Sequence, residues 1–189
     1  MGRDQGTGEL MSMEDVPLAL PAAAVADAKA YLRVEQDGED ALLGGLMASA
    51  ARLCEQFSRR ALLERTFRET ISASTSWTRL SATPARTIMT VEAAPPDGPA
   101  APLASDAYAI DIDANGDGWV RLLQQSEGRI RVTYEAGMAA DWSDVPEALR
   151  QGIVRLAAHF YAHRDAAEDA GPPAVVTALW RPWRRMRLG

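Results

Sequence analysis

A shortage of cysteine and of long apolar runs limits what this sequence can be. Cys54 is the only cysteine among 189 residues, so the chain cannot form an internal disulfide, and a disulfide-stabilised secreted domain is excluded. The longest uncharged apolar run covers residues 16–26, which is too short to span a bilayer. It follows acidic residues, whereas a signal peptide requires basic ones. We therefore expect a protein of the cytoplasm, with no targeting segment and no membrane partner.

The sequence also has fewer basic than acidic residues. It contains 20 Lys and Arg residues and 26 Asp and Glu residues, which gives a net charge of −6. Proteins that bind nucleic acid through its phosphates usually have a basic balance or a basic face. Here the only arginine cluster lies at the very end of the chain, so broad affinity for nucleic acid is not expected. Apolar residues make up 47% of the chain, which is enough for one substantial core.

The apolar residues recur at helical spacing near both ends of the chain. Three segments share this pattern, namely residues 21–34, 40–60 and 144–164. Their apolar faces comprise, in turn, Val25, Ala28 and Leu32; Leu42, Leu46, Ala50, Leu53 and Phe57; and Leu149, Ile153, Leu156 and Phe160. We expect the last of these helices to form the centre of the core. A shorter helix is expected at 174–179.

Two local signals refine the helix predictions. Asp144 is expected to cap the helix at 144–164, with Pro146 in its first turn, where no intrahelical donor is needed. Gly44 and Gly45 lie inside the helix at 40–60, although glycine there is less favourable than alanine by roughly 1 kcal/mol. Their presence predicts that a neighbouring helix approaches closely at this point.

The middle of the sequence has the pattern of a small antiparallel β module. Its apolar segments are short, several alternate apolar with polar residues, and turn-forming residues separate them. The expected strands cover residues 66–71, 77–80, 87–91, 108–112, 119–122 and 129–134. Residues 115–118, Asn-Gly-Asp-Gly, favour a tight hairpin turn, and residues 95–99 form a proline-rich loop.

Together these patterns predict an α+β fold, in which an amphipathic helical bundle receives a small antiparallel β module as an insertion. The bundle would consist of two N-terminal helices and a long C-terminal helix. The expected divisions of the chain are a flexible leader at 1–15, N-terminal helices at 16–64, the β module at 65–140, C-terminal helices at 141–179 and an extended basic and aromatic arm at 180–189.

Three constellations resemble metal-binding or reactive sites, and each has a simpler explanation. Residues 111–118 copy the first half of a calcium loop, but Leu122 occupies the position of the bidentate carboxylate, which favours a polar hairpin turn. His159 and His163 share a helix face without an evident third ligand. Cys54 lies beside an apolar helix face and is expected to be a small buried side chain. We therefore expect no catalytic residue, no cofactor and no metal site.

The C-terminal arm combines large aromatic with basic side chains and is the candidate functional site. Its residues are Trp180, Arg181, Trp183, Arg184, Arg185, Arg187 and Leu188. Exposing two tryptophans to water is unfavourable, and Trp and Arg are enriched at protein interfaces. We expect this arm to dock on a protein partner. DNA phosphates are the alternative partner, and the salt dependence of binding would separate the two.

Several segments resemble, in their order and spacing, the head–tail connector (adaptor, head-completion) proteins of tailed bacteriophages and gene transfer agents. They are Ala28–Val34, Arg59–Leu63, Thr66–Arg68, Gly128–Gly137 and Val145–Arg164. The resemblance covers residues 16–185 and implies a non-enzymatic protein that forms a ring, typically a dodecamer, below the portal protein. Such a ring extends the DNA channel and presents a surface to the tail or to a stopper or terminator protein. It also implies that the arm reaches the portal.

The resemblance further implies a place in the neck between capsid and tail of a particle made in the bacterial cytoplasm. DNA would pass through the ring without sequence-specific binding. Two other functions stay open from the residues alone. A DNA-binding module would use Arg184, Arg185 and Arg187, and its affinity would fall steeply with salt. A metal-dependent enzyme would use His159 and His163 and would contain stoichiometric metal.

Overall fold

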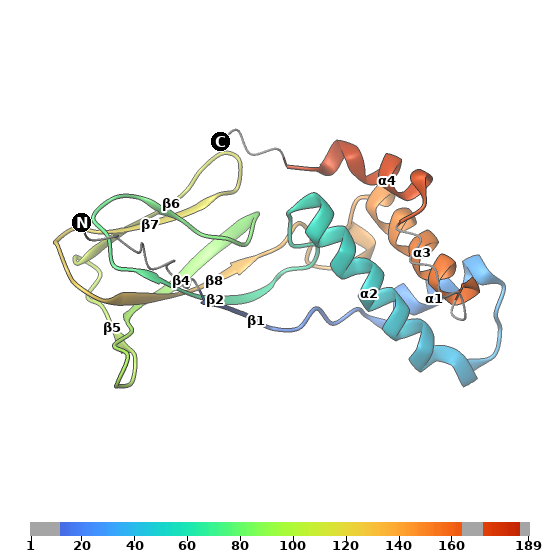
Figure 1. The fold of residues 1–189 in the computed structure, drawn as a ribbon, viewed down its shortest axis with the longest axis horizontal. Helices are drawn as coiled ribbons and strands as arrows, with labels where there is room; N and C mark the ends of the chain where they lie inside the picture. Colours follow the sequence, from blue (N-terminus) through green and yellow to red (C-terminus); the bar gives the residue numbers. More distant parts are fainter. Residues whose placement is uncertain (1–11, 164–171, 186–189) are drawn as a thin grey trace, which may run out of the picture. The chain divides into compact units, whose positions relative to one another are not determined.

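The computed structural model describes residues 12–163 and 172–185, which form a β unit and a helix unit (Figure 1). The β unit comprises the chain up to Val16 together with Arg65–Ala136, and the helix unit comprises Pro17–Glu64 and the chain from Gly137 onward. The chain therefore passes between the units three times. A mixed α+β fold is confirmed, with four α-helices and two antiparallel sheets among the described residues.

The elements follow the sequence predictions closely. The helices are α1 (Ala22–Leu32), η1 (Asp37–Glu39), α2 (Asp40–Ser58), η2 (Trp142–Asp144), α3 (Glu147–Ala162), α4 (Ala174–Trp180) and η3 (Arg181–Trp183), where η marks a 3-10 helix. The strands are β1 (Ser12–Asp15), β2 (Arg65–Ser72), β3 (Thr78–Arg79), β4 (Ala85–Ala93), β5 (Ala101–Pro102), β6 (Tyr108–Ile112), β7 (Gly118–Leu122) and β8 (Arg129–Ala136). All the predicted strands are present, and β1 and β5 are additional. Within the described ranges, no helix combines the length and the apolar character that crossing a membrane requires.

The β unit contains a larger sheet with the strand order β1-β2-β8-β4-β5 and a smaller sheet with the order β3-β7-β6. Side chains alternate along β2, where Phe67 and Ile71 are buried and Arg68 is exposed, as expected for a sheet with one buried face. The Phe67 ring stacks on that of Tyr134 on β8, with 5.8 Å between the ring centroids. The paired strands β2 and β8 therefore form the centre of this unit.

A buried carboxylate joins this centre to the loop before β4. Glu69 occupies an inward position on β2 and has no solvent exposure. It accepts hydrogen bonds from the Tyr134 hydroxyl (2.9 Å) and from the backbone N–H (2.8 Å) and hydroxyl (2.6 Å) of Ser81. The N–H of Ala82 donates in turn to the Tyr134 oxygen at 2.9 Å. Burial and the nearby Glu69 raise the pKa of Tyr134 well above its usual range, so the phenol stays a donor.

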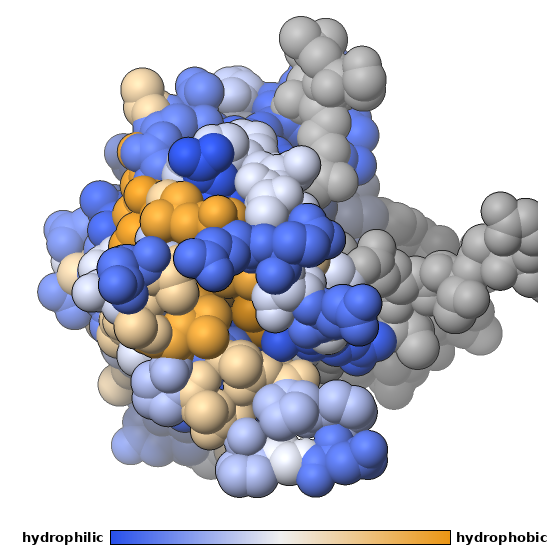
Figure 2. Space-filling model, turned by 90° about the vertical axis from the view of Figure 1, so that its left-hand side faces the viewer, coloured by the Kyte–Doolittle hydropathy of each residue, from blue (hydrophilic) through white to orange (hydrophobic). Residues whose placement is uncertain are grey.

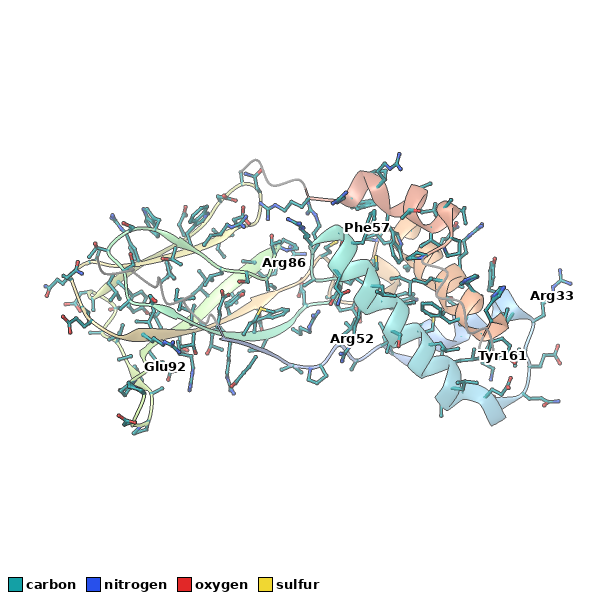
Figure 3. All side chains as sticks on the ribbon, viewed as in Figure 1. Arg33, Arg52, Phe57, Arg86, Glu92 and Tyr161 are labelled. Atoms are coloured by element: carbon teal, nitrogen blue, oxygen red, sulfur yellow. The ribbon has the colours of Figure 1, made fainter. Side chains whose placement is uncertain are left out.

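In the helix unit, α2 and α3 are the central elements, because they contact each other and each also contacts α1 and α4. Leu149, Ile153 and Leu156, from the predicted apolar face, are fully buried. The core around them includes Ala28, Met47, Ala50, Cys54, Ala157, Val176 and Trp180. The Tyr161 hydroxyl donates a hydrogen bond to Glu39, which ties the end of α3 to η1 (Figure 3).

The predicted apolar face of α2 is confirmed in part. Ala50 is fully buried, and Leu46, Leu53 and Phe57 are partly buried against the core, but Leu42 is 43% exposed. The fully buried residues of α2 are Leu43, Met47, Ala50, Ala51, Cys54 and Ser58, so the centre of the buried face lies about one position further along the helix. The predicted close approach at Gly44 and Gly45 is wrong. A Cβ on Gly44 would meet only a Val25 methyl group at 3.8 Å, and a Cβ on Gly45 would have no neighbour within 4 Å.

The start of α3 also differs from the prediction, in which Asp144 caps the helix. The helix begins at Glu147, Pro146 occupies the N-cap position, and no side chain caps it. Val145 is extended (φ −62°, ψ 131°), because the residue before a proline is sterically excluded from the helical region. Asp144 therefore ends the separate 3-10 turn η2.

The predicted leader and the predicted module boundary both change in the structure. Ser12–Asp15, assigned to the flexible leader, is strand β1 and pairs with β2, while residues 1–11 lie outside the described part of the chain. The β unit ends at Ala136 rather than at residue 140. The residues that follow bond within the helix unit, since the N–H of Met138 donates to the Ala61 carbonyl at 3.0 Å and that of Glu64 to the Ala139 carbonyl at 2.9 Å.

The hydrogen bonds of Tyr134 predict a large effect of removing one oxygen atom. Tyr134→Phe should lower the free energy of unfolding by about 1–3 kcal/mol, because the buried Glu69 carboxylate and the Ala82 N–H each lose a partner. Tyr108→Phe, on the partly exposed strand β6, is the matched control and should change it by less than about 0.5 kcal/mol. Urea unfolding followed by circular dichroism measures both variants. Equal stability of the two would contradict the role given to the buried network.

Candidate functional site

The predicted C-terminal arm begins inside the core of the helix unit. Trp180, the last residue of α4, has no solvent exposure. Its ring lies 5.9 Å from that of Phe57, centroid to centroid, near the C-terminal end of α2 (Figure 3). Its indole nitrogen lies 3.4 Å from the Leu149 carbonyl oxygen on α3, to which it donates a hydrogen bond. The first residue of the arm is therefore a core residue that connects α2, α3 and α4.

A glycine on α3 makes room for this tryptophan. A Cβ on Gly152 would lie 2.1 Å from the Trp180 indole nitrogen and 2.8 Å from two ring carbons, so any larger residue would overlap the ring. The close approach of elements that was predicted at Gly44 and Gly45 therefore occurs at Gly152. The sequence did carry a signal for this contact. Gly152 lies in the middle of a broad apolar helix face, and a glycine in such a position usually allows another element to pack closely.

Beyond Trp180, the arm follows the end of α2. Trp183 is half-buried against the helical core, and the Arg184 guanidinium lies 5.7 Å from the centre of the Phe57 ring. The backbone N–H of Arg185 donates to the carbonyl of Ser58, the last residue of α2, at 3.1 Å. These contacts hold the described part of the arm on the helix unit and fix where its charged groups lie.

The arm residues differ in what they can present to a partner. Arg181 and Arg184 are exposed, and Trp183 and Arg185 are half-buried. Trp180 is fully buried within this chain, so its side chain is not available to a partner. The remaining residues of the predicted site, Arg187 and Leu188, lie outside the described part of the chain. Docking of the arm on a partner stays a prediction.

A second candidate region in the helix unit is a pocket of about 430 Å³ lined by α1 and α3. Its lining includes Asp27, Tyr31 and Arg150, without Ser, Cys or His. The Asp27 carboxylate accepts a hydrogen bond from the Trp142 indole at 2.8 Å and lies 4.0 Å from the Arg150 guanidinium. Asp27 therefore stabilises the fold.

The calcium-like stretch is the β6–β7 hairpin, so the prediction of a polar hairpin turn is confirmed. The Asp113 carboxylate accepts hydrogen bonds from the N–H groups of Asn115 (2.8 Å) and Asp117 (3.0 Å) and from the Trp119 indole (3.2 Å). Gly116 has φ +77°, a conformation that glycine adopts without strain. In residues 12–163 and 172–185, no group of three or more His, Cys, Asp or Glu side chains could hold a metal ion.

The two histidines and the cysteine lie in the helix unit. The His159 and His163 rings face each other at the end of α3, with 4.2 Å between centroids, and His163 is exposed. Cys54 is fully buried, as predicted. Burial, with a smaller contribution from Glu55, raises the pKa of the Cys54 thiol well above its usual range. Because the thiolate is the nucleophilic form, Cys54 is unsuited to nucleophilic catalysis.

No protein-family model and no curated protein matches this sequence, but solved structures do. A chain in the neck of an empty gene transfer agent (GTA) particle, computed with C6 symmetry, is 26% identical and has a TM-score of 0.76. The similarity covers 94% of this chain and 97% of that chain. The protein resembles a GTA neck component. Chains in the native GTA virion and in the native GTA neck, computed with C12 symmetry, are also 26% identical, with TM-scores of 0.73 and 0.69.

The GTA neck chains confirm the family resemblance that the sequence segments predicted. The two other comparisons cover 93% and 94% of this chain and 96% and 97% of the chains found, so the similarity includes both the helix unit and the β unit. The particles in which these chains occur also agree with the neck location that the resemblance implied. The similarity thus concerns the whole architecture rather than one common motif.

The space beside Gly152 that the Trp180 ring fills, here called the notch, yields a testable prediction about the base of the arm. Gly152→Ala should lower the free energy of unfolding by about 1–3 kcal/mol, because overlap of the new methyl group with Trp180 outweighs the roughly 1 kcal/mol gain in helix propensity. Gly45→Ala is the matched control, since its Cβ would have no neighbour within 4 Å. It should be neutral or stabilising. Denaturation followed by tryptophan fluorescence compares them, and equal stability would show that Trp180 does not occupy the notch.

Proposed function

We propose that this chain is a structural head–tail connector (adaptor) in the neck of a phage or phage-like particle. The observation that carries the proposal is 26% identity to a chain of a GTA neck over 94% of this chain and 97% of that one. Because the similarity includes both units, it supports the role of the whole chain. The role is structural and needs neither a catalytic residue nor a cofactor.

The connector would act as a ring of identical subunits below the portal protein. GTA neck structures computed with C6 and C12 symmetry contain the similar chains, which supports a ring, and we infer a dodecamer. The ring would extend the DNA channel. The net charge of −6 fits this task, because DNA has to pass through the ring without being held by its phosphates.

The C-terminal arm would provide the contact with the portal. Trp180 fixes the base of the arm in the helix core, and Arg181 and Arg184 are exposed beyond it. An arginine that is held in place loses less conformational entropy on binding, and arginine is enriched at interface hot spots. Arg187 and Leu188 would continue this contact. The opposite side of the ring would receive the tail or a stopper or terminator protein.

The location of the chain in particles tests the proposal directly. Particles that carry a small folded tag on this chain should show extra density in the neck, between capsid and tail, when imaged by electron microscopy. The density should follow the symmetry of a ring. Untagged particles are the control, and extra density on the capsid shell or along the tail would contradict the connector role.

The portal contact is tested by reversing charge on the arm. The double variant Arg181→Glu and Arg184→Glu should weaken binding to the portal of the same particle by at least about tenfold, measured by titration calorimetry. Arg52→Glu is the matched control, because Arg52 is an exposed arginine on α2 (Figure 3). Any deletion of the arm has to begin after Arg185, since Trp180 belongs to the core. Portal binding equal to that of the control would contradict the docking role.

Exposed arginines also favour a second candidate function, a DNA-binding module. The same variants separate the two candidates when they are titrated with duplex DNA over a range of salt concentrations. A connector should bind DNA weakly at physiological salt, with little difference between variants. Affinity that falls steeply with salt and is lost with Arg181 and Arg184 would favour the DNA-binding function instead.

A further inference from the structure

One end of the β unit carries an exposed apolar patch. The chain enters and leaves this unit where β1 ends and β2 begins, and the register pairs Asp15 with Phe67 and Arg65 with Ala136. The patch lies at the other end of the strands, where Ser72 pairs with Arg129. Viewed from the left of Figure 1, apolar side chains gather there within a border of hydrophilic ones (Figure 2).

A pocket of about 360 Å³ lies in this patch. Both sheets and the loops between their strands contribute its apolar lining, which is Ala73, Ala93, Leu103, Ala107, Leu122 and Ile130. Leu122 and Ile130 form a buried floor, with 5% and 3% exposure. Leu103, on the loop after β5, is half-buried and is the other large side chain of the lining. This arrangement leaves apolar surface in contact with water, although the residues beneath it are well packed.

The polar groups of the pocket lie at its border rather than inside it. Asp106 and the segment 124–127 are part of the lining, and all of these residues are exposed. A small-molecule site usually places a few buried polar groups where they fix the orientation of the ligand. An apolar centre with an exposed polar rim is instead the anatomy of a protein interface. The patch therefore fits a protein partner.

The charge around the patch defines the chemistry of that partner. Asp106 and Glu127 place two exposed carboxylates at the rim, against one arginine, Arg129. Complementary charge favours a partner with Lys or Arg beside its apolar anchor, and it disfavours the phosphates of DNA.

We propose that this patch is the docking site for the tail-side neighbour of the connector, a protein that inserts an apolar side chain flanked by basic residues. The inference depends on the proposed function, in which the arm of the helix unit binds the portal. A connector needs a second, different surface for the protein on its other side. The patch belongs to the β unit and shares no residue with the arm.

Substitution of a leucine that lines the pocket tests the docking site. Complexes of portal and connector are incubated with purified tails, and electron microscopy counts the fraction of complexes that carry a tail. Leu103→Asp should assemble on the portal normally but lower tail attachment at least tenfold. Met89→Asp is the matched control, because Met89 is 44% exposed in the same unit and does not line the pocket. It should attach tails as the wild type does.

Charge reversal at the rim gives an independent test that leaves the apolar groups unchanged. The double variant Asp106→Lys and Glu127→Lys, at two exposed loop positions, should also lower tail attachment about tenfold. Normal attachment with either this variant or Leu103→Asp would overturn the proposal. Loss of ring assembly by Leu103→Asp alone would also overturn it, since the patch would then bind a second copy of the chain. Failure of the wild-type ring to join the portal would instead refute the connector function.

Discussion

Burial of one tryptophan is the contact on which the C-terminal half of the helix unit depends. α4 has seven residues, and an isolated helix of this length is not stable in water. It is stable here because Val176 and Trp180 are fully buried in the hydrophobic core, together with the buried residues of α3. The absence of a side chain at Gly152 allows the indole to lie directly on the α3 backbone. The position from which the arm continues beyond α4 therefore follows from this one contact.

The helices could be predicted from the sequence because their apolar residues are periodic, but the centre of the buried face could be predicted for α3 and only in part for α2. In α3, Leu149, Ile153 and Leu156 identify one face, and they are buried. In α2, adjacent apolar residues occur in nearly every turn, as in Leu42–Leu43 and Leu46–Met47. Two overlapping faces then have the same period, and only the neighbouring helices determine which one is buried.

The contacts that hold the base of the candidate site and the core of the β unit depend on residues far apart in the sequence, and no local pattern could predict them. Trp180 and the Leu149 carbonyl are 31 positions apart, and Glu69 and Tyr134 are 65 positions apart. The composition of the arm predicted a surface segment, since Trp and Arg together are typical of interfaces. That inference treated the arm as one segment, whereas the structure places its first residue in the core. The family resemblance, by contrast, depended on the order of several segments, and this order is what a similar fold preserves.

The chain leaves the helix unit after Glu64 and returns to it at Gly137, and these two positions are adjacent. A Cβ on Gly137 would lie 2.3 Å from the Glu64 nitrogen, and four backbone hydrogen bonds join the segments 61–64 and 137–139. The entropy of closing a long loop grows only slowly with its length. The segment 65–136, which lies between these two positions, can therefore differ in length with little effect on the stability of the helices.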